Sequence, residues 1–294
     1  MSNTLQIGPL TFPLQLLLVF AAVALALFVA NLLGRKADVD TDTPLFRVLL
    51  LAVLAARVGF VIEYRAIYLA TPLDMLDIRD GGWQPVTGLA AAWVGALVLG
   101  WRRPRVRFTV MSALAAATLV WGLGTVALAW QPIQTTRLPS ISLTSVDGQP
   151  VVLSEFSGAP TVVNLWTTWC PPCQREMPVM AKAQADHPGI HFVFLNQGES
   201  QAKVRSYLAA HKLGLRNVLL DKQGQAGKHF GQKALPATFF FDAQGRLVDT
   251  RIGELSHATL NQRLQALGPP RSISQPLNSC IQINTRFVGH ARFC

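Results

Sequence analysis

The first half of this 294-residue chain is short of charge, and several residue types are missing from long stretches of it. The first 34 residues contain no lysine or arginine. A cleaved signal peptide needs a basic segment before a short apolar core, so we expect the apolar run Leu14–Leu33 to be a retained membrane helix. No cysteine precedes Cys170. This absence excludes a membrane carrier that relays electrons through an embedded cysteine pair, because thiol exchange needs a thiol.

The chain is nevertheless basic, with a net charge of +10, and such a charge invites a nucleic-acid interpretation. Part of the excess comes from a cluster between two apolar runs, formed by Arg102, Arg103, Arg105 and Arg107. Membrane proteins keep basic residues of this kind in cytoplasmic loops. We therefore expect a membrane protein that has no nucleic-acid partner.

Long apolar runs occupy residues 1–130, at Leu14–Leu33, Leu45–Leu69, Val86–Trp101 and Phe108–Trp130. About twenty apolar residues span the hydrocarbon core of a bilayer. The first and third loops between these runs carry the excess of lysine and arginine, whereas the second loop is mostly acidic, with Asp74, Asp77 and Asp80 against Arg79. The positive-inside rule places the basic loops inside. We therefore expect a four-helix, multi-pass region in a bacterial inner membrane, with both termini and the C-terminal domain on the periplasmic side.

The stretch 161–178, TVVNLWTTWCPPCQREMP, joins a β-branched strand pattern to a helix-compatible segment through Cys170-Pro171-Pro172-Cys173. The first thiol of such a pair lies over unpaired backbone N–H groups and the positive end of the helix dipole, which stabilise its thiolate. Prolines are tolerated in a first helical turn. The second thiol is close enough to form a disulfide with the first. We expect Cys170 to be the nucleophile and Cys173 to resolve the mixed disulfide.

Half of a zinc site is the alternative interpretation of the same residues. The other cysteines, Cys280 and Cys294, lie far along the chain, and the sequence leaves their pairing open. The spacing of His187 and His191 suits a metal-binding helix, but Pro188-Gly189 between them breaks any helix. We therefore expect a redox dithiol, no metal, and no cofactor other than the redox-active disulfide itself.

The C-terminal half alternates strand and helix patterns. We expect a tether over 131–139, a domain over 140–268 and a disordered tail over 269–294. Within the domain, a hairpin lies around Asp147-Gly148. Further strands are predicted at 161–166, 190–196, 217–220, 237–241 and 247–252, and helices at 171–187, 200–212 and 256–267. This order predicts an α/β domain with a mixed central sheet and flanking helices.

The motif WCPPCQREMP, preceded by VVNLW, resembles the active site of the TlpA/ResA-like membrane-tethered, thioredoxin-fold thiol–disulfide oxidoreductases. The likeness extends over about 138–267. It implies that Pro236 has a cis peptide bond and lies beside the dithiol, and that Leu235 before it contacts the substrate. It also implies that Trp169 shields the first thiol and forms a substrate-contact surface with Pro171 and Pro172; a core aromatic is the alternative for Trp169.

Glu176 follows Cys173 by three residues, about one helical turn, so its side chain can face the dithiol. The resemblance implies that Glu176 influences thiol protonation. A solvated first-turn glutamate, favoured by the helix dipole, is the alternative. Asn164 stands where cytosolic thioredoxins carry a buried aspartate, so that proton acceptor is missing. We count Glu176 and Pro236 with the two cysteines as the expected catalytic residues.

The membrane half has a resemblance of its own. Its segments ARVGF (56–60), EY (63–64) and DGGW (80–83) are similar to part of prolipoprotein diacylglyceryl transferase, over about Arg57–Arg103. That family has a catalytic histidine where this chain has Val86-Thr87-Gly88, and no histidine precedes His187. We therefore expect a degenerate anchor without transferase activity. Arg57 lies within the second apolar run, where it either contacts a lipid headgroup or pairs inside the bundle.

These features together predict a membrane-anchored, extracytoplasmic thiol–disulfide oxidoreductase, with a reductase favoured by the resemblance. Its expected partners are proteins with thiols or disulfides, the lipid bilayer, and a separate membrane or periplasmic electron donor, because the membrane half carries no thiol of its own. Three alternatives stay open: a disulfide-forming oxidase, a lipid-binding or transferase-like membrane protein with an accessory redox module, and a non-catalytic binding module.

Overall fold

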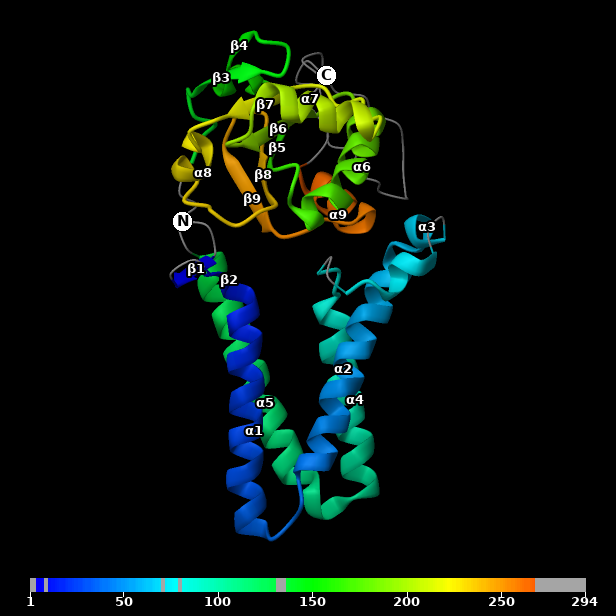
Figure 1. The fold of residues 1–294 in the computed structure, drawn as a ribbon. Helices are drawn as coiled ribbons and strands as arrows, with labels where there is room; N and C mark the ends of the chain where they lie inside the picture. Colours follow the sequence, from blue (N-terminus) through cyan, green and yellow to red (C-terminus); the bar gives the residue numbers. More distant parts are fainter. Residues whose placement is uncertain (1–3, 8–9, 70–71, 79–80, 131–135, 268–294) are drawn as a thin grey trace, which may run out of the picture.

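A computed structural model describes residues 4–7, 10–69, 72–78, 81–130 and 136–267 (Figure 1). The predicted tail 269–294, with Cys280 and Cys294, lies outside the described residues. The described chain forms two parts, a bundle of long helices and an α/β domain that lies at one end of it. This is the division that the composition of the two halves predicts.

The bundle contains the long helices that the apolar runs predict, namely α1 (Leu14–Ala37), α2 (Asp42–Glu63), α4 (Pro85–Arg102) and α5 (Pro104–Ala129). Both α4 and α5 begin with a proline. Proline lacks a backbone N–H, which costs nothing in the first helical turn because an N–H there would have no helical partner. Among the described residues, three helices are long and apolar enough to cross a membrane: α1, α2 and residues Pro104–Leu128 of α5. The shorter α4, of 18 residues, lies against α2 and is not one of these three helices. The fourth membrane span therefore stays a prediction.

Stripes of small residues explain how these helices pack. In α1 and in α4 the buried residues recur every fourth position, as Ala22, Ala26, Ala30 and Gly34, and as Gly88, Ala92, Ala96 and Gly100. A Cβ atom at Gly88 would lie 2.9 Å from the carbonyl oxygen of Ala52 in α2. Small residues let membrane helices approach closely where no hydrophobic force drives them together. As a result α1 pairs with α5 and α2 with α4, which Figure 1 shows as two arms.

Short elements join and precede the long helices. A two-stranded antiparallel hairpin, β1 (Thr4–Ile7) and β2 (Leu10–Pro13), leads into α1 and was not predicted from the sequence. After α2 the chain forms the short α3 (Arg65–Tyr68) and the 3-10 turn η1 (Pro72–Leu76) before it enters α4. The second apolar run is therefore divided between a long helix and a short one at Tyr64.

The α/β domain is built on a seven-stranded mixed sheet with the order β4-β3-β7-β6-β5-β8-β9. The strands β5, β6 and β7 are parallel, and β8 and β9 continue the sheet as an antiparallel hairpin. Every residue of β5 and of β8 is buried, as expected for central strands covered on both faces. The strands span Ser142–Ser145 (β3), Pro150–Val152 (β4), Thr161–Trp166 (β5), His191–Gln197 (β6), Val218–Asp221 (β7), Ala237–Phe241 (β8) and Leu247–Ile252 (β9).

Alternate residues of β5 enter two separate apolar cores. Val162 and Trp166 pack with residues of α6 (Pro171–Asp186), α7 (Gln201–Ala210) and α9 (His257–Ala266). Val163 and Leu165 pack on the other face with residues of the 3-10 turn η2 (Leu153–Phe156) and of α8 (Gln225–His229). Helices therefore cover both faces of the sheet. Ser256 caps α9 in a capping box with Thr259, which confirms the predicted start of that helix.

The domain begins earlier than its predicted boundary. Leu138, placed in the tether by the sequence analysis, is 5% exposed and belongs to one of the two apolar cores. The carbonyl of Thr136 accepts a hydrogen bond from the backbone of Leu247, and Arg137 forms a bridge with Arg246. Residues 136–138 of the predicted tether therefore bond to the β8–β9 turn and to the first residue of β9, and residues 131–135 lie outside the described part.

Candidate active site

The two cysteines lie where the strand β5 passes into the helix α6. Cys170 is the N-cap of α6, and Pro171 and Pro172 form its first turn. Cys170 and Cys173 form a disulfide, with Cα atoms 5.2 Å apart, and the Cys170 Sγ accepts a hydrogen bond of 3.3 Å from the backbone N–H of Cys173. Both cysteines are buried, Cys173 completely. The helix terminus thus holds the outer sulfur, and the inner sulfur faces the core.

The loop before β8 lies at the same edge of the sheet. The Leu235–Pro236 peptide bond is cis, as the resemblance implied, and the Pro236 carbonyl accepts a hydrogen bond from the backbone of Gly253. Leu235 is half-buried, whereas Trp169 before the first cysteine is 65% exposed. An exposed tryptophan beside a redox disulfide can pack on an incoming polypeptide. The substrate-contact roles of these residues and of the two prolines stay predictions.

Glu176 is completely buried, so the alternative of a solvated first-turn glutamate is wrong. Its Oε1 accepts hydrogen bonds of 3.4 Å from Asn164 of β5 and from Thr238 of β8, which are paired across the two strands. Burial raises the pKa of Glu176 well above its usual value, the negative charge of Glu254 raises it further, and the Thr238 hydrogen bond and the charge of Arg251 oppose the rise. A buried carboxyl with a raised pKa therefore lies one helical turn from Cys173.

Sequence reasoning identified Glu176 but missed its partners. Asn164 was noted only as a missing aspartate, and Thr238 comes from a strand 74 residues further on. Glu254 forms a bidentate ion pair with Arg175 of α6, with a closest approach of 2.6 Å. For the contact between Thr238 and Glu176, the sequence offers one signal: the pairing of β5 with β8 that places Thr238 opposite Asn164.

A second buried carboxylate holds the loop that precedes the dithiol. Glu199 accepts hydrogen bonds from the backbone N–H and the hydroxyl of Thr168, at 2.7 and 2.6 Å, and from the amide of Asn196 at 2.7 Å. It also forms an ion pair of 2.8 Å with Lys203. Burial alone would raise the pKa of Glu199, but the hydrogen bonds from Lys203, Thr168 and Asn196 outweigh it and lower that pKa. Asn196 and Lys203 are near Glu199 in the sequence, but its contact with Thr168 is set by the tertiary fold, and no role for Glu199 was predicted.

We expect Glu199→Ala to loosen this loop. Hydrogen bonds to a charged group contribute roughly 1.5–3 kcal/mol each, and the substitution leaves buried donors unpaired. If the free energy of local opening falls by about 2 kcal/mol, hydrogen exchange at the Thr168 amide becomes roughly 30-fold faster. Exchange measured by mass spectrometry on the full chain checks this. The matched control is Glu155→Ala at an exposed glutamate of η2, which should leave the exchange unchanged; equal exchange in both variants would contradict the role of Glu199.

Arg57 lies inside the membrane half rather than at its surface. It is 8% exposed, and its guanidinium donates hydrogen bonds to the backbone carbonyls of Met75, Asp77 and Gly82. It also lies over the rings of Phe60 and Tyr68, at 6.0 and 5.6 Å from their centroids. These contacts favour pairing inside the bundle, and the lipid contact of Arg57 stays a prediction.

Thr87 lies in the segment Val86-Thr87-Gly88, where the transferase family has its histidine motif. The Thr87 hydroxyl shares its one proton between the carbonyl oxygens of Ala55 and Gln84, at 3.2 and 2.9 Å, so it holds α4 against α2. A hydroxyl bonded in this way offers no group that titrates near neutral pH. In the described part of the chain, no three metal-binding side chains gather anywhere.

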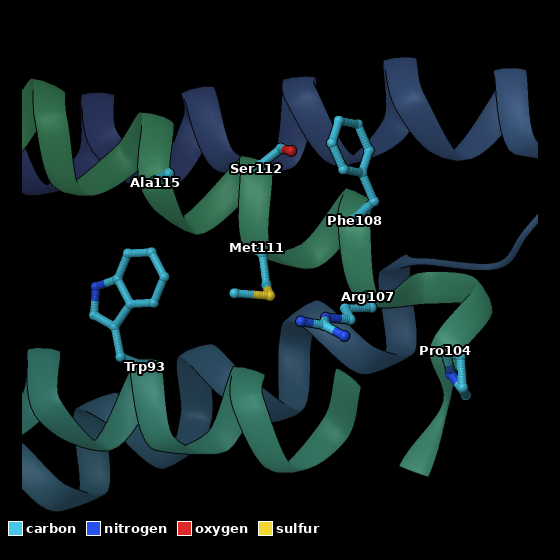
Figure 2. A pocket seen from close by; sticks show the side chains of 7 residues that line it. All are labelled: Trp93, Pro104, Arg107, Phe108, Met111, Ser112 and Ala115. Atoms are coloured by element: carbon cyan, nitrogen blue, oxygen red, sulfur yellow. The ribbon is translucent and has the colours of Figure 1, made fainter. Parts of the chain in front are cut away.

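A hollow of about 550 Å³ opens between α4 and α5 near the basic loop (Figure 2). It is lined by Trp93, Pro104, Arg107, Phe108, Met111, Ser112 and Ala115. In Figure 2 the indole of Trp93 and the thioether of Met111 lie on its apolar side, with the Arg107 guanidinium beside Met111. The hollow shares no residue with the dithiol site and lies at the opposite end of the bundle from the α/β domain.

Each half of the chain matches a known protein family. Residues 134–266 match the Redoxin family, and residues 3–129 match the prolipoprotein diacylglyceryl transferase family. The second match covers the whole membrane region, well beyond the segment 57–103 that the sequence analysis identified. Neither family model covers the whole chain.

Curated relatives match the C-terminal half. The thiol-disulfide oxidoreductase ResA of Bacillus thuringiensis subsp. konkukian is 29% identical over 133 residues, which cover 45% of this chain and 76% of that protein. ResA of Bacillus subtilis is 28% identical over 134 residues, covering 45% and 74%. Among solved structures, a thiol:disulfide interchange protein of the thioredoxin family from Chlorobium tepidum is 28% identical, with a TM-score of 0.42, and covers 47% of this chain and 100% of that one.

The fold and the dithiol thus define the C-terminal half as a thioredoxin-like thiol–disulfide oxidoreductase. More specifically, this half matches the Redoxin family and is similar to ResA proteins, and the apolar helices that precede it make the chain membrane-anchored. The predicted fold class, enzyme class and family resemblances are confirmed.

Proposed function

We propose that this chain is an extracytoplasmic disulfide reductase, anchored in the inner membrane, that exchanges disulfides with protein substrates through Cys170 and Cys173. The observation that carries the proposal is the buried carboxyl of Glu176, held one helical turn below Cys173 by Asn164 and Thr238.

The position of Glu176 favours reduction over oxidation of substrates. Strong disulfide oxidants owe their potential to a reduced form that is stabilised, through a thiolate of low pKa. A buried carboxyl beside the dithiol supplies no positive charge, and once ionised it repels a thiolate. This environment makes the thiolate form of the dithiol less favourable, so the reduced protein gives up its electrons more readily.

The geometry also suggests how the reaction divides between the two sulfurs. The Cys170 thiolate, at the positive end of α6, attacks a substrate disulfide, forms a mixed disulfide and releases one substrate thiolate. Cys173 has no exposed surface, so its proton passes to the Glu176 carboxylate instead of to water. The Cys173 thiolate then attacks the Cys170 sulfur and releases the second substrate thiolate. Two electrons pass to the substrate, and the protein ends as the Cys170–Cys173 disulfide.

The arrangement of the basic residues supports the proposed side of the membrane. The turn between α4 and α5, with its arginine cluster, lies at the end of the bundle away from the α/β domain (Figure 1). If this basic turn is cytoplasmic, as the positive-inside rule requires, the dithiol faces the opposite side. A separate electron donor must then reduce the disulfide again, because no cysteine precedes Cys170.

The reduction potential tests this proposal directly. We expect a value near or below that of thioredoxin, about −270 mV, for the full chain in detergent. Cys280→Ser and Cys294→Ser in the background isolate the Cys170–Cys173 couple, and alkylation after equilibration in dithiothreitol buffers gives the reduced fraction. A value near −120 mV would instead identify a disulfide-forming oxidase. The absence of a measurable couple would leave a binding module.

A further inference from the structure

The two halves of the chain touch at a small apolar contact. Phe60 of α2 and Tyr68 of α3 form a buried cluster with Ala258 in the first turn of α9. All three side chains are 1% exposed or less. Figure 1 shows α3 and α9 at the near ends of the two halves. Ala258 belongs to this cluster and to neither of the two apolar cores of the α/β domain.

Two glycines continue the contact surface. A Cβ atom at Gly82 would overlap the ring of Phe60 and lie 2.9 Å from a guanidinium nitrogen of Arg57, so Gly82 fits against the membrane half. Gly81 adopts a left-handed conformation, with φ of 70°, and a Cβ there would lie 2.7 Å from the guanidinium of Arg251 in β9. The Gly-Gly pair therefore fits between the membrane half on one side and the α/β domain on the other.

Arg251 connects this contact to the dithiol site. In the sheet Arg251 is paired with Thr238, whose hydroxyl donates a hydrogen bond to Glu176. Two residues further on, Gly253 binds the Pro236 carbonyl, and Glu254 forms its ion pair with Arg175. The membrane half thus contacts the same edge of the sheet that carries the dithiol, the cis-proline and the buried glutamate.

We propose that Phe60, Tyr68 and the Gly81-Gly82 pair form a docking surface for the α/β domain, and that the docked surface fixes Arg251 as a positioning residue for Glu176. This proposal deepens the proposed function and rests on it, since it assigns Glu176 to proton transfer from Cys173. It also gives Arg57 a purpose, because Arg57 holds the carbonyls of Met75, Asp77 and Gly82 and so shapes the surface.

Docking of the α/β domain affects the pKa of Glu176 through the charges that surround it. The charged groups that act on Glu176 are Glu254, which raises its pKa, and Arg251, which lowers it. If the domain undocks, Arg251 loses its position against Gly81 and becomes hydrated, so its attraction for the Glu176 carboxylate is screened. The pKa of Glu176 then rises further, and resolution by Cys173 requires a higher pH.

The test uses the full chain in detergent, with Cys280→Ser and Cys294→Ser in the background. Ala258→Glu places a charge in the apolar contact from the domain side. Tyr68→Ala weakens the same contact from the membrane side and leaves the domain sequence intact. The control is Ala202→Glu, the same substitution at an exposed alanine of α7. Two quantities are measured: hydrogen exchange of α9, and the pH midpoint for resolution of a preformed mixed disulfide at Cys170.

We expect Ala258→Glu and Tyr68→Ala each to speed exchange in the first turn of α9 by about tenfold and to move the pH midpoint upward, with both quantities unchanged in the control. Unchanged exchange in both variants would overturn the docking surface. Faster exchange with an unchanged midpoint would overturn the role of Arg251. The exchange result does not depend on the reduction potential, so a failure of the reductase assignment is distinguishable from a failure of docking.

Discussion

Replacing Cys170 by serine reduces disulfide turnover to background, a loss of at least about 1,000-fold, whereas Cys173→Ser preserves the first attack and traps the substrate as a mixed disulfide. The difference follows from the two positions. The Cys170 sulfur is at the helix N-terminus, where a thiolate is stabilised, and a serine hydroxyl does not ionise there. Cys173 is buried behind it and acts only after the mixed disulfide has formed.

The measurement is dithiothreitol-driven reduction of insulin by the full chain, with non-reducing electrophoresis to detect the trapped complex. Cys280→Ser and Cys294→Ser are the matched controls, and both should retain turnover. A Cys170→Ser protein that still turns over insulin would contradict the assignment of the nucleophile. A Cys173→Ser protein that fails to form a complex, while Cys170 still reacts with iodoacetamide, would contradict the division of roles between the two sulfurs.

Replacing Glu176 by glutamine slows resolution of the mixed disulfide by about 100-fold and flattens its dependence on pH. General-base catalysis contributes roughly 100-fold to 10,000-fold, and an amide cannot accept the Cys173 proton. Glutamine keeps the size of the side chain and its acceptor oxygen for Asn164 and Thr238. Stopped-flow release of substrate thiol measures the step, and Glu155→Gln, at an exposed glutamate, should leave it unchanged. A full rate in Glu176→Gln would exclude this carboxyl as the proton acceptor.

The same substitution changes how stability depends on pH. The folded protein holds the Glu176 proton more tightly than the unfolded chain, in which a glutamate has a pKa of about 4.3. The wild type therefore loses stability as the pH rises above that value towards the raised pKa of the folded state. The Glu176→Gln variant lacks this loss, so its stability relative to wild type grows between pH 5 and pH 8. Hydrogen exchange of the β5 amides in both proteins at pH 5 and pH 8 measures this difference in stability. A stability advantage of Glu176→Gln that shrinks as the pH rises would contradict the prediction.

The elements that the sequence predicted correctly depend on local patterns. The apolar runs are long enough to specify the membrane helices, and the β-branched stretch before Cys170 specifies β5 and the start of α6. The spacing from Cys173 to Glu176 is one helical turn, which predicted that the Glu176 side chain can face the dithiol. The predicted boundary at residue 140 left out Leu138, whose backbone bonds to Gly245 more than 100 residues later, and no local signal in the sequence reports that contact.

The parts that the sequence did not predict are contacts between distant segments. Glu199 reads as a loop residue, yet it binds Thr168 across 31 positions. Gly81-Gly82 was noted only for its resemblance to a transferase, whereas the structure places Gly81 against Arg251, 170 residues later. A buried polar contact of this kind requires both partners to be positioned by the fold, and a single sequence specifies neither their distance nor their orientation.

The junction between the two halves also sets how far the dithiol can travel. The helix α5 is followed by Trp130, and Thr136 is already bonded to the sheet through Leu247, so six peptide steps join the two fixed points. Fully extended, six residues reach about 20 Å. Even an undocked domain therefore searches only a thin layer of solution above the membrane. Substrates that are themselves attached to the bilayer meet the dithiol at a high effective concentration, and freely diffusing proteins gain no such advantage.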